Sequence, residues 1–125
     1  MNRSAQPQGK LAVWLDDVRP MPVGFDVHVK TASQAIELLR AKKVRKISLD
    51  HDLGEIAYDG HRRVDPGNGY QVACAIEEMA NDGYPRLEVL FHSANPVGRR
   101  KMEEAICWAQ KCWDDRETDE RLVGV

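Results

Sequence analysis

Three short polar clusters, each directly after an apolar run, carry the side chains best suited to chemistry. They are Asp16-Asp17, Asp50-His51-Asp52 and His92-Ser93-Ala94-Asn95. If the apolar runs are parallel strands, these clusters meet beyond the carboxyl ends of the sheet, where open α/β sheets bind ligands. Carboxylates packed so closely repel one another, and a hard divalent ion such as Mg²⁺ or Mn²⁺ would neutralise them. We therefore expect Asp16, Asp17 and Asp50 to hold a metal.

Two histidines stand at the ends of strands that should be neighbours. His51 and His92 could supply a general base and a general acid near neutral pH, and we take both as candidate catalytic residues. The alternative for each is a hydrogen-bonded structural histidine. Strand alternation prevents every polar residue from facing one site, so we expect Asp52 to cap a turn. His28 lies on an alternating stretch and should face solvent.

Polar and cationic side chains near these clusters are candidates for contacting phosphate. Asn95-Pro96 is typical of a helix N-cap followed by the first helical residue, and a helix N-terminus offers free N–H groups to an anion. The expected phosphate contacts are Ser93, Asn95, Arg19, Arg62, Arg63 and Arg99. The alternatives are a turn at Ser93, a plain cap at Asn95 and solvated charges for the loop arginines.

The elements that must position these residues alternate along the chain. Strands are predicted from apolar or alternating runs at 11–15, 25–30, 44–49 and 87–91. Helices are predicted from helical spacing of apolar residues over 32–43, from Asn68 to Asn81, and from Pro96 through Trp113. This alternation predicts an α/β fold, a three-layer α/β/α sandwich of the receiver or flavodoxin type. We expect about four mostly parallel strands in the order 2-1-3-4.

Two connections stand out. Only residues 18–24 separate the first two strands, and an extended link of that length spans about 23 Å without a helix. The second strand is therefore parallel through a loop that replaces the first helix, or antiparallel; we favour the parallel arrangement. The glycine-containing stretch 54–69 predicts a long loop of the kind that closes over ligands, and it carries Arg62 and Arg63.

Composition limits the remaining choices. The 125 residues carry 18 basic and 20 acidic side chains, so a globally basic surface for double-stranded DNA is not expected. No apolar run reaches the length of a membrane span. Three cysteines without a Cys-x-x-Cys pair predict reduced, buried thiols and a cytoplasmic protein. The domain should span 11–113, between a disordered 1–10 and a polar tail at 114–125, with Trp108 and Trp113 in or beside the core.

The order and spacing of several segments resemble response-regulator receiver domains over about residues 11–110. The segments are Val13-Trp-Leu-Asp-Asp17, Val29-Lys-Thr-Ala-Ser-Gln-Ala-Ile-Glu-Leu-Leu39, Ile47-Ser-Leu-Asp50 and Leu90-Phe-His-Ser-Ala94. By this resemblance, Asp50 stands where receivers carry the phosphoaccepting aspartate. The chain departs from receivers in lacking a helix after the acidic pair and room for a fifth strand with its lysine.

Leu-Asp-Asp at 15–17, Leu-Asp-His-Asp-Leu-Gly at 49–54 and His-Ser-Ala-Asn-Pro at 92–96 resemble a divergent group, the cyclic-phosphate-processing receiver-like domains. The resemblance implies a metal-assisted phosphoesterase acting on cyclic phosphates, such as a 2′,3′-cyclic phosphate on a nucleotide or RNA end. Asp50 then joins His51 and His92 as a candidate catalytic residue, and the partner is a phosphorylated small molecule or RNA end. Two alternatives remain: a signalling module phosphorylated on Asp50, and a metal-binding interaction protein without chemistry.

Overall fold

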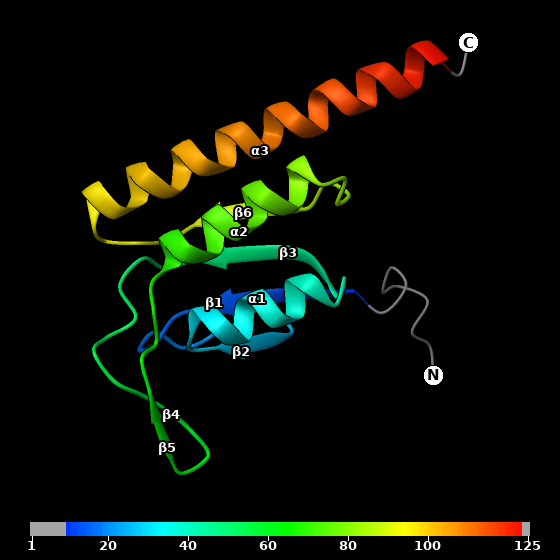
Figure 1. Ribbon diagram of the computed structural model, residues 1–125. Helices are drawn as coiled ribbons and strands as arrows, with labels where there is room; N and C mark the ends of the chain where they lie inside the picture. The colour runs from blue at the N-terminus through cyan, green and yellow to red at the C-terminus, as the bar shows by residue number, and fades with distance from the viewer. Residues whose placement is uncertain (1–9, 124–125) are drawn as a thin grey trace, which may run out of the picture.

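Four parallel strands form the central sheet of the computed structural model, which describes residues 10–123 (Figure 1). They are β1 (Leu11–Leu15), β2 (Val27–Val29), β3 (Val44–Leu49) and β6 (Glu88–Phe91). The strand order is β2-β1-β3-β6, and every neighbouring pair is parallel. The α/β fold, the predicted order of the four strands and the parallel second strand are therefore confirmed. The second strand is shorter than the predicted 25–30: β2 covers only Val27–Val29, and Phe25 and Asp26 lie before it.

The three helices are α1 (Ala32–Arg40), α2 (Gly69–Asn81) and α3 (Pro96–Val123). Side chains cap their starts as the sequence predicts: Thr31 accepts a hydrogen bond from the Gln34 amide at 3.1 Å, and Asn68 forms a capping box with Gln71. Helix α1 ends before Lys42, which has a φ of 60°, so it is shorter than the expected 32–43.

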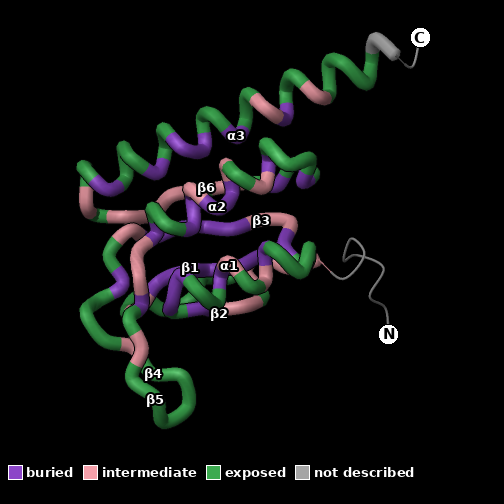
Figure 2. Tube along the Cα trace, viewed as in Figure 1, coloured by how far each residue is buried: buried purple, intermediate pink, exposed green. Residues whose placement is uncertain are grey.

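All three helices share one apolar core with one face of the sheet (Figure 2). On that face lie Val13, Leu15, Ile47 and Leu49, all fully buried. The chain moves from β2 to β3 and then to β6 in a single direction across the sheet. Right-handed crossovers in one direction place their helices on the same side, which explains this arrangement.

The opposite face is covered by the extended segment 16–26 in place of a helix. The Asp26 amide donates to the Ala12 carbonyl at 2.8 Å, and the Asp26 carboxylate accepts from the Ala12 amide at 2.8 Å. The Trp14 indole donates to the Arg19 carbonyl at 3.3 Å. Pro20 and Pro22 disfavour a helix here. This extended segment takes the place of the first helix, as expected, and the three helices all lie on the other face of the sheet.

The long loop before α2 contains a small hairpin that the sequence analysis did not predict. Its strands are β4 (Ala57–Asp59) and β5 (Arg62–Val64), antiparallel, with Tyr58 opposite Arg63. The turn includes Gly60 at a φ of 66°. Strands of three residues are too short to show a period of two, so the pattern was invisible. The hairpin projects from the body at the carboxyl end of the sheet (Figure 1).

Residues 114–123, expected as a polar tail, continue helix α3 instead. The Arg86 guanidinium bonds Asp114 and Glu117, and Arg116 donates to the Tyr84 carbonyl at 3.1 Å. These contacts hold the end of α3, which has no continuous apolar stripe over 114–123. The prediction that α3 ends at Trp113 and is followed by a tail is therefore wrong. The predicted disorder of 1–10 falls almost entirely outside the described residues. Among residues 10–123, no helix combines the length and apolarity needed to cross a bilayer.

Two expectations about the core need correction. Trp113 is buried, as predicted, and its indole donates to the Tyr84 carbonyl at 2.8 Å, but Trp108 is 59% exposed. The expected buried thiols are not found either, because Cys107 is exposed while Cys74 and Cys112 are half-buried. Helical spacing shows which residues share one side of a helix, but it does not show how wide the buried side is. On α3 the buried side is narrow, so Trp108 and Cys107 are exposed.

Candidate metal and phosphate site

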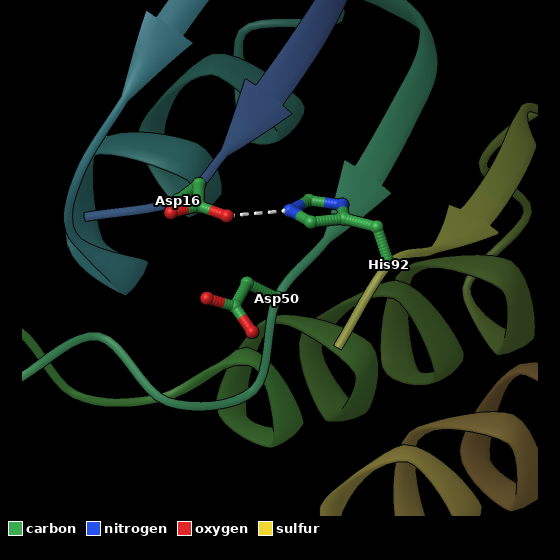
Figure 3. Close-up of side chains that lie close together, drawn as sticks. All are labelled: Asp16, Asp50 and His92. Carbon is green, nitrogen blue, oxygen red and sulfur yellow. Dashed lines mark hydrogen bonds and ion pairs between the residues drawn. The ribbon is translucent and has the colours of Figure 1, made fainter. Parts of the chain in front are cut away.

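Three side chains converge where their strands end. Asp16 follows β1, Asp50 follows β3 and His92 follows β6, and each offers a ligand atom within 4.8 Å of the others (Figure 3). The parallel sheet places these strand ends at one edge, as predicted from the sequence. The arrangement could hold a metal ion, because two carboxylates and an imidazole nitrogen face a shared space.

Asp16 is the most constrained of the three, with a relative exposure of 1%. Its Oδ1 atom accepts hydrogen bonds from the amides of Val18 at 2.8 Å and Arg19 at 2.7 Å. Burial acts to raise the pKa of this carboxyl, but the amides of Arg19 and Val18 and the His92 ring outweigh burial. The pKa therefore lies below the ordinary value, and Asp16 is an ionised acceptor at neutral pH.

Asp50 behaves in the opposite way. Burial, followed by the negative charge of Asp16, raises the pKa of the Asp50 carboxyl, and Asp17 adds to this effect. The His51 amide and the Arg19 charge offset only part of it. The site therefore holds more negative charge than its own cations neutralise, which favours binding of an added cation.

His92 has both ring nitrogens engaged. Its Nε2 lies 2.9 Å from Asp16 Oδ2, and its Nδ1 lies 2.7 Å from Ser48 Oγ. Burial lowers the pKa of His92 despite the opposing effect of Asp16, so the ring is neutral at neutral pH. Since ionised Asp16 can only accept, Nε2–H donates to Asp16 and Nδ1 accepts from the Ser48 hydroxyl. Trp14 stacks on the ring with centroids 3.7 Å apart.

His51 lies on the other side of the strand end, against the start of α3. Its Nδ1 lies 2.8 Å from Asp52 Oδ1, and its ring fills the space beside Gly98, where a Cβ atom would meet it at 2.3 Å. The Asn95 side-chain amide donates to Asp52 at 3.2 Å. Hydrogen bonds from His51 and Asn95 lower the pKa of Asp52. Asp52 therefore links His51 to the helix cap and does not cap a turn.

A cavity of about 420 Å³ opens at this edge of the sheet. It is lined by Asp16, Asp17, Val18, Arg19, Asp50, Asp52, Gly54 and Ala94. All three predicted metal-binding aspartates line it, whereas neither candidate histidine does. Gly54, at a φ of 82°, brings the backbone close to Asp17, since a Cβ there would lie 3.1 Å from Asp17 Oδ2. The cavity is thus mainly an acidic one.

The residues predicted to contact phosphate separate into two groups. Arg19 lines the cavity, and its guanidinium donates to the His92 carbonyl. The others lie outside the cavity lining. Ser93 Oγ accepts from the Asn95 amide at 3.1 Å, Asn95 Oδ1 caps α3 by accepting from the Gly98 amide at 3.0 Å, and Arg99 pairs with Glu103 at 3.1 Å. Arg62 and Arg63 are exposed on β5.

Three contacts escaped the sequence analysis. Ser48 and Trp14 both touch His92, and the signal for Ser48 was a hydroxyl inside an otherwise apolar strand end. His28, expected to face solvent, instead has its Nε2 2.8 Å from the Asp16 carbonyl. Alternation along a strand predicts which side of the sheet a residue such as His28 faces. It does not predict whether a backbone carbonyl on that side forms a hydrogen bond with the side chain.

A parallel sheet with acidic side chains after its first and third strands defines a receiver-like α/β domain. The family model of the cyclic-phosphate processing receiver domain matches residues 11–107, and the chain belongs to this family. The matched range includes the four strands of the sheet and Asp16, Asp50 and His92. Comparisons with curated proteins and with solved structures find no match.

Proposed function

We propose that this domain is a metal-dependent phosphoesterase that opens cyclic phosphates, with a 2′,3′-cyclic phosphate on a nucleotide or RNA end as the candidate substrate. The observation that carries the proposal is the pairing of Asp16 and Asp50 in one cavity. The pKa of Asp16 is lowered by its hydrogen bonds, whereas burial and the negative charge of Asp16 raise the pKa of Asp50. Membership of the cyclic-phosphate processing family supports the choice of substrate.

The donor set fits Mg²⁺ or Mn²⁺. Both ions prefer oxygen ligands, and the carboxylates of Asp16 and Asp50 would hold the ion, with Asp17 at the same cavity wall. When bound, a divalent ion offsets negative charge on phosphate oxygens. Arg19, which lines the cavity and whose guanidinium is fixed on the His92 carbonyl, is placed to bind a phosphate oxygen.

Opening the ring requires two proton transfers. A water oxygen bonds to phosphorus and gives up a proton, while one ribose oxygen leaves phosphorus and takes a proton. We assign both proton transfers to His51, which would take the proton from water and then give one to the ribose oxygen. The Nδ1 atom of His51 is held by Asp52, and its Nε2 makes no hydrogen bond to the residues that the structure describes. Because Asp52 but not His51 lines the cavity, the proton would pass through one intervening water.

In this proposal His92 acts differently from the role predicted from sequence. Its Nε2–H is committed to Asp16 and its Nδ1 to Ser48, so the ring orients a metal-binding carboxylate. Release of either hydrogen bond would be needed before His92 could exchange a proton with substrate. His92 is thus a positioning residue here, and His51 carries the catalytic proposal.

The test is ³¹P NMR of the protein with Mg²⁺ against a 2′,3′-cyclic nucleotide and acetyl phosphate in one tube. We expect multiple-turnover loss of the cyclic signal, abolished by Asp50→Asn. Asp115→Asn, an exposed carboxylate on α3, is the matched control and should leave turnover unchanged. Persistence of the cyclic signal with the folded wild-type protein would overturn the proposal.

A second candidate is a signalling module phosphorylated on Asp50. The observation favouring it is the position of Asp50 after β3 of a receiver-like sheet, next to Asp16. It predicts a stoichiometric aspartyl-phosphate signal from acetyl phosphate, with the cyclic donor untouched. If both donors persist, the remaining interpretation is a metal-binding interaction protein.

A further inference from the structure

We propose that a second cavity, beside the acidic one, seats the nucleobase of the substrate, and that Tyr58 selects for nucleotides. The inference rests on the proposed function and adds to it a binding subsite on the β4–β5 hairpin. The second cavity measures about 330 Å³ and is lined by Asp17, Lys30, Leu53, Ile56, Ala57 and Tyr58.

The two cavities adjoin. Asp17 lines both, and the consecutive residues Leu53 and Gly54 line the second and the first respectively. A ligand with a phosphate group beside Asp16 and Asp50 would therefore extend past Asp17 toward the hairpin. A phosphate alone would leave the second cavity empty, so the pair of cavities fits a substrate with a sizeable organic group attached to its phosphate.

The lining of the second cavity suits a planar, aromatic group. Tyr58 is 64% exposed and Ile56 is 48% exposed, so both present apolar surface to solvent, and the buried Leu53 lines the same cavity. Aromatic side chains bind bases by stacking, with little dependence on which base is present. Lys30 and Asp17 add a donor and an acceptor for the polar edge of a base or for ribose hydroxyls.

The hairpin also brings positive charge to this subsite. Tyr58 and Arg63 are directly opposite in the β4–β5 register, so their side chains share one face of the ribbon. Together with Lys30, Arg63 places cationic groups beside a site whose own walls are acidic. An anionic nucleotide is attracted to such a surface, whereas an uncharged aromatic molecule gains less from it.

The test compares two five-membered cyclic phosphates, one that carries a nucleoside and one that does not: adenosine 2′,3′-cyclic phosphate and glycerol 1,2-cyclic phosphate. Tyr58→Ala should raise KM for the adenosine compound about tenfold, the scale of a lost stacking contact. It should leave kcat, and both constants for the glycerol compound, nearly unchanged. Tyr58→Phe keeps the ring and should restore the wild-type KM. Tyr70→Ala, a half-exposed tyrosine on α2 outside both cavities, is the matched control.

A binding measurement separates this inference from the proposed function. Adenosine, which carries no phosphate for the acidic metal-free cavity to repel, is titrated into the metal-free protein while backbone amide NMR signals are followed. Shifts centred on residues 53–58, lost in Tyr58→Ala but kept in Tyr70→Ala, would support the subsite even if no cyclic phosphate is turned over. An equal rise in KM for both cyclic compounds in Tyr58→Ala, or no shift in the signals of residues 53–58, would overturn the subsite while leaving the phosphoesterase proposal intact.

Discussion

The imidazole of His92 lies 2.9 Å from the carboxylate of Asp16, although their strands, β6 and β1, are not neighbours in the sheet. Strand β3 runs between them and contributes Ser48, whose hydroxyl lies 2.7 Å from the other ring nitrogen. The three strand ends are therefore joined by one chain of hydrogen bonds. This chain of hydrogen bonds fixes the Asp16 carboxylate in a single orientation, so a residue just beyond a strand end can present its side chain in a defined geometry.

Removing His92 should weaken metal binding. His92→Ala frees the Asp16 carboxylate to rotate, and losing a side chain that orients a ligand typically costs about 10- to 100-fold in metal affinity. The measurement is a Mn²⁺ titration followed by electron paramagnetic resonance. His61→Ala, in the exposed hairpin turn, should retain wild-type affinity. An unchanged affinity in His92→Ala would mean that Asp16 is held by the Val18 and Arg19 amides alone.

Stability should fall on mild acidification because of the same histidine. Burial lowers the pKa of His92 below 6.5, so the unfolded chain binds a proton there at a higher pH than the folded protein. The stability that neutral His92 contributes is fully present above that value and is lost as the pH falls through the folded-state pKa. Asp16, whose pKa is also lowered, acts in the same direction at lower pH.

Urea unfolding from neutral pH down to about pH 5 measures this effect. His92→Gln keeps an amide that can bond Asp16 but has no titrating ring, so its stability should change less with pH than that of the wild type. The other three histidines are common to both proteins and cancel in the comparison. Parallel pH dependences for the two proteins would contradict the assignment.

Neutralising Asp50 should stabilise the metal-free protein. The pKa of Asp50 is raised by burial and by the charge of Asp16, so its ionised form is unfavourable in the fold at neutral pH. We expect Asp50→Asn to increase the free energy of unfolding by on the order of 1 kcal/mol without metal. Thermal unfolding in the presence of a chelator measures this gain.

Added Mg²⁺ should make the wild type more stable than Asp50→Asn, the reverse of their order without metal. At 100 times its dissociation constant a ligand stabilises the folded state by about 2.7 kcal/mol, and only a protein with the intact site gains this. The wild type should therefore overtake Asp50→Asn in melting temperature as Mg²⁺ rises. Equal responses of the two proteins to Mg²⁺ would place the ion elsewhere.

A methyl group at position 98 should displace His51. The Cβ of Gly98→Ala would lie 2.3 Å from the His51 ring, closer than packing allows, and overpacking of this kind costs about 1–3 kcal/mol. The double variant Gly98→Ala with His51→Ala removes the clash and should recover much of the lost stability. Chemical denaturation of the four proteins in this cycle gives the coupling energy; a coupling near zero would mean that the helix start moves instead.

Much of the fold follows from patterns that lie within single segments. Apolar or alternating runs predicted the four sheet strands, and Thr31 and Asn68 marked helix starts because capping is a local interaction. The hairpin at 57–64 was missed because its strands are too short for periodicity. The continuation of α3 over 114–123 was missed because most of its residues are charged and because it is held by Arg86 and Arg116, whose contacts join segments distant in sequence.

The candidate site was predictable as a place but not as a set of contacts. Parallel strands bring Asp16, Asp50 and His92 to one edge, which topology alone predicts. Whether His92 faces substrate or bonds Asp16 depends on the position of Ser48 across the sheet and on stacking with Trp14. Those are distances between segments, and residue spacing along the chain carries no information about them.

The β4–β5 hairpin pairs with itself and with no strand of the main sheet. Its length and composition can therefore vary without altering the register of the strands that carry Asp16 and Asp50. Under our proposals, recognition and reaction are encoded in separate stretches of chain. Transplanting a different hairpin onto this scaffold would retarget the domain to another organic group while the acidic centre stays as it is, which makes the fold a natural starting point for diversification and for engineering.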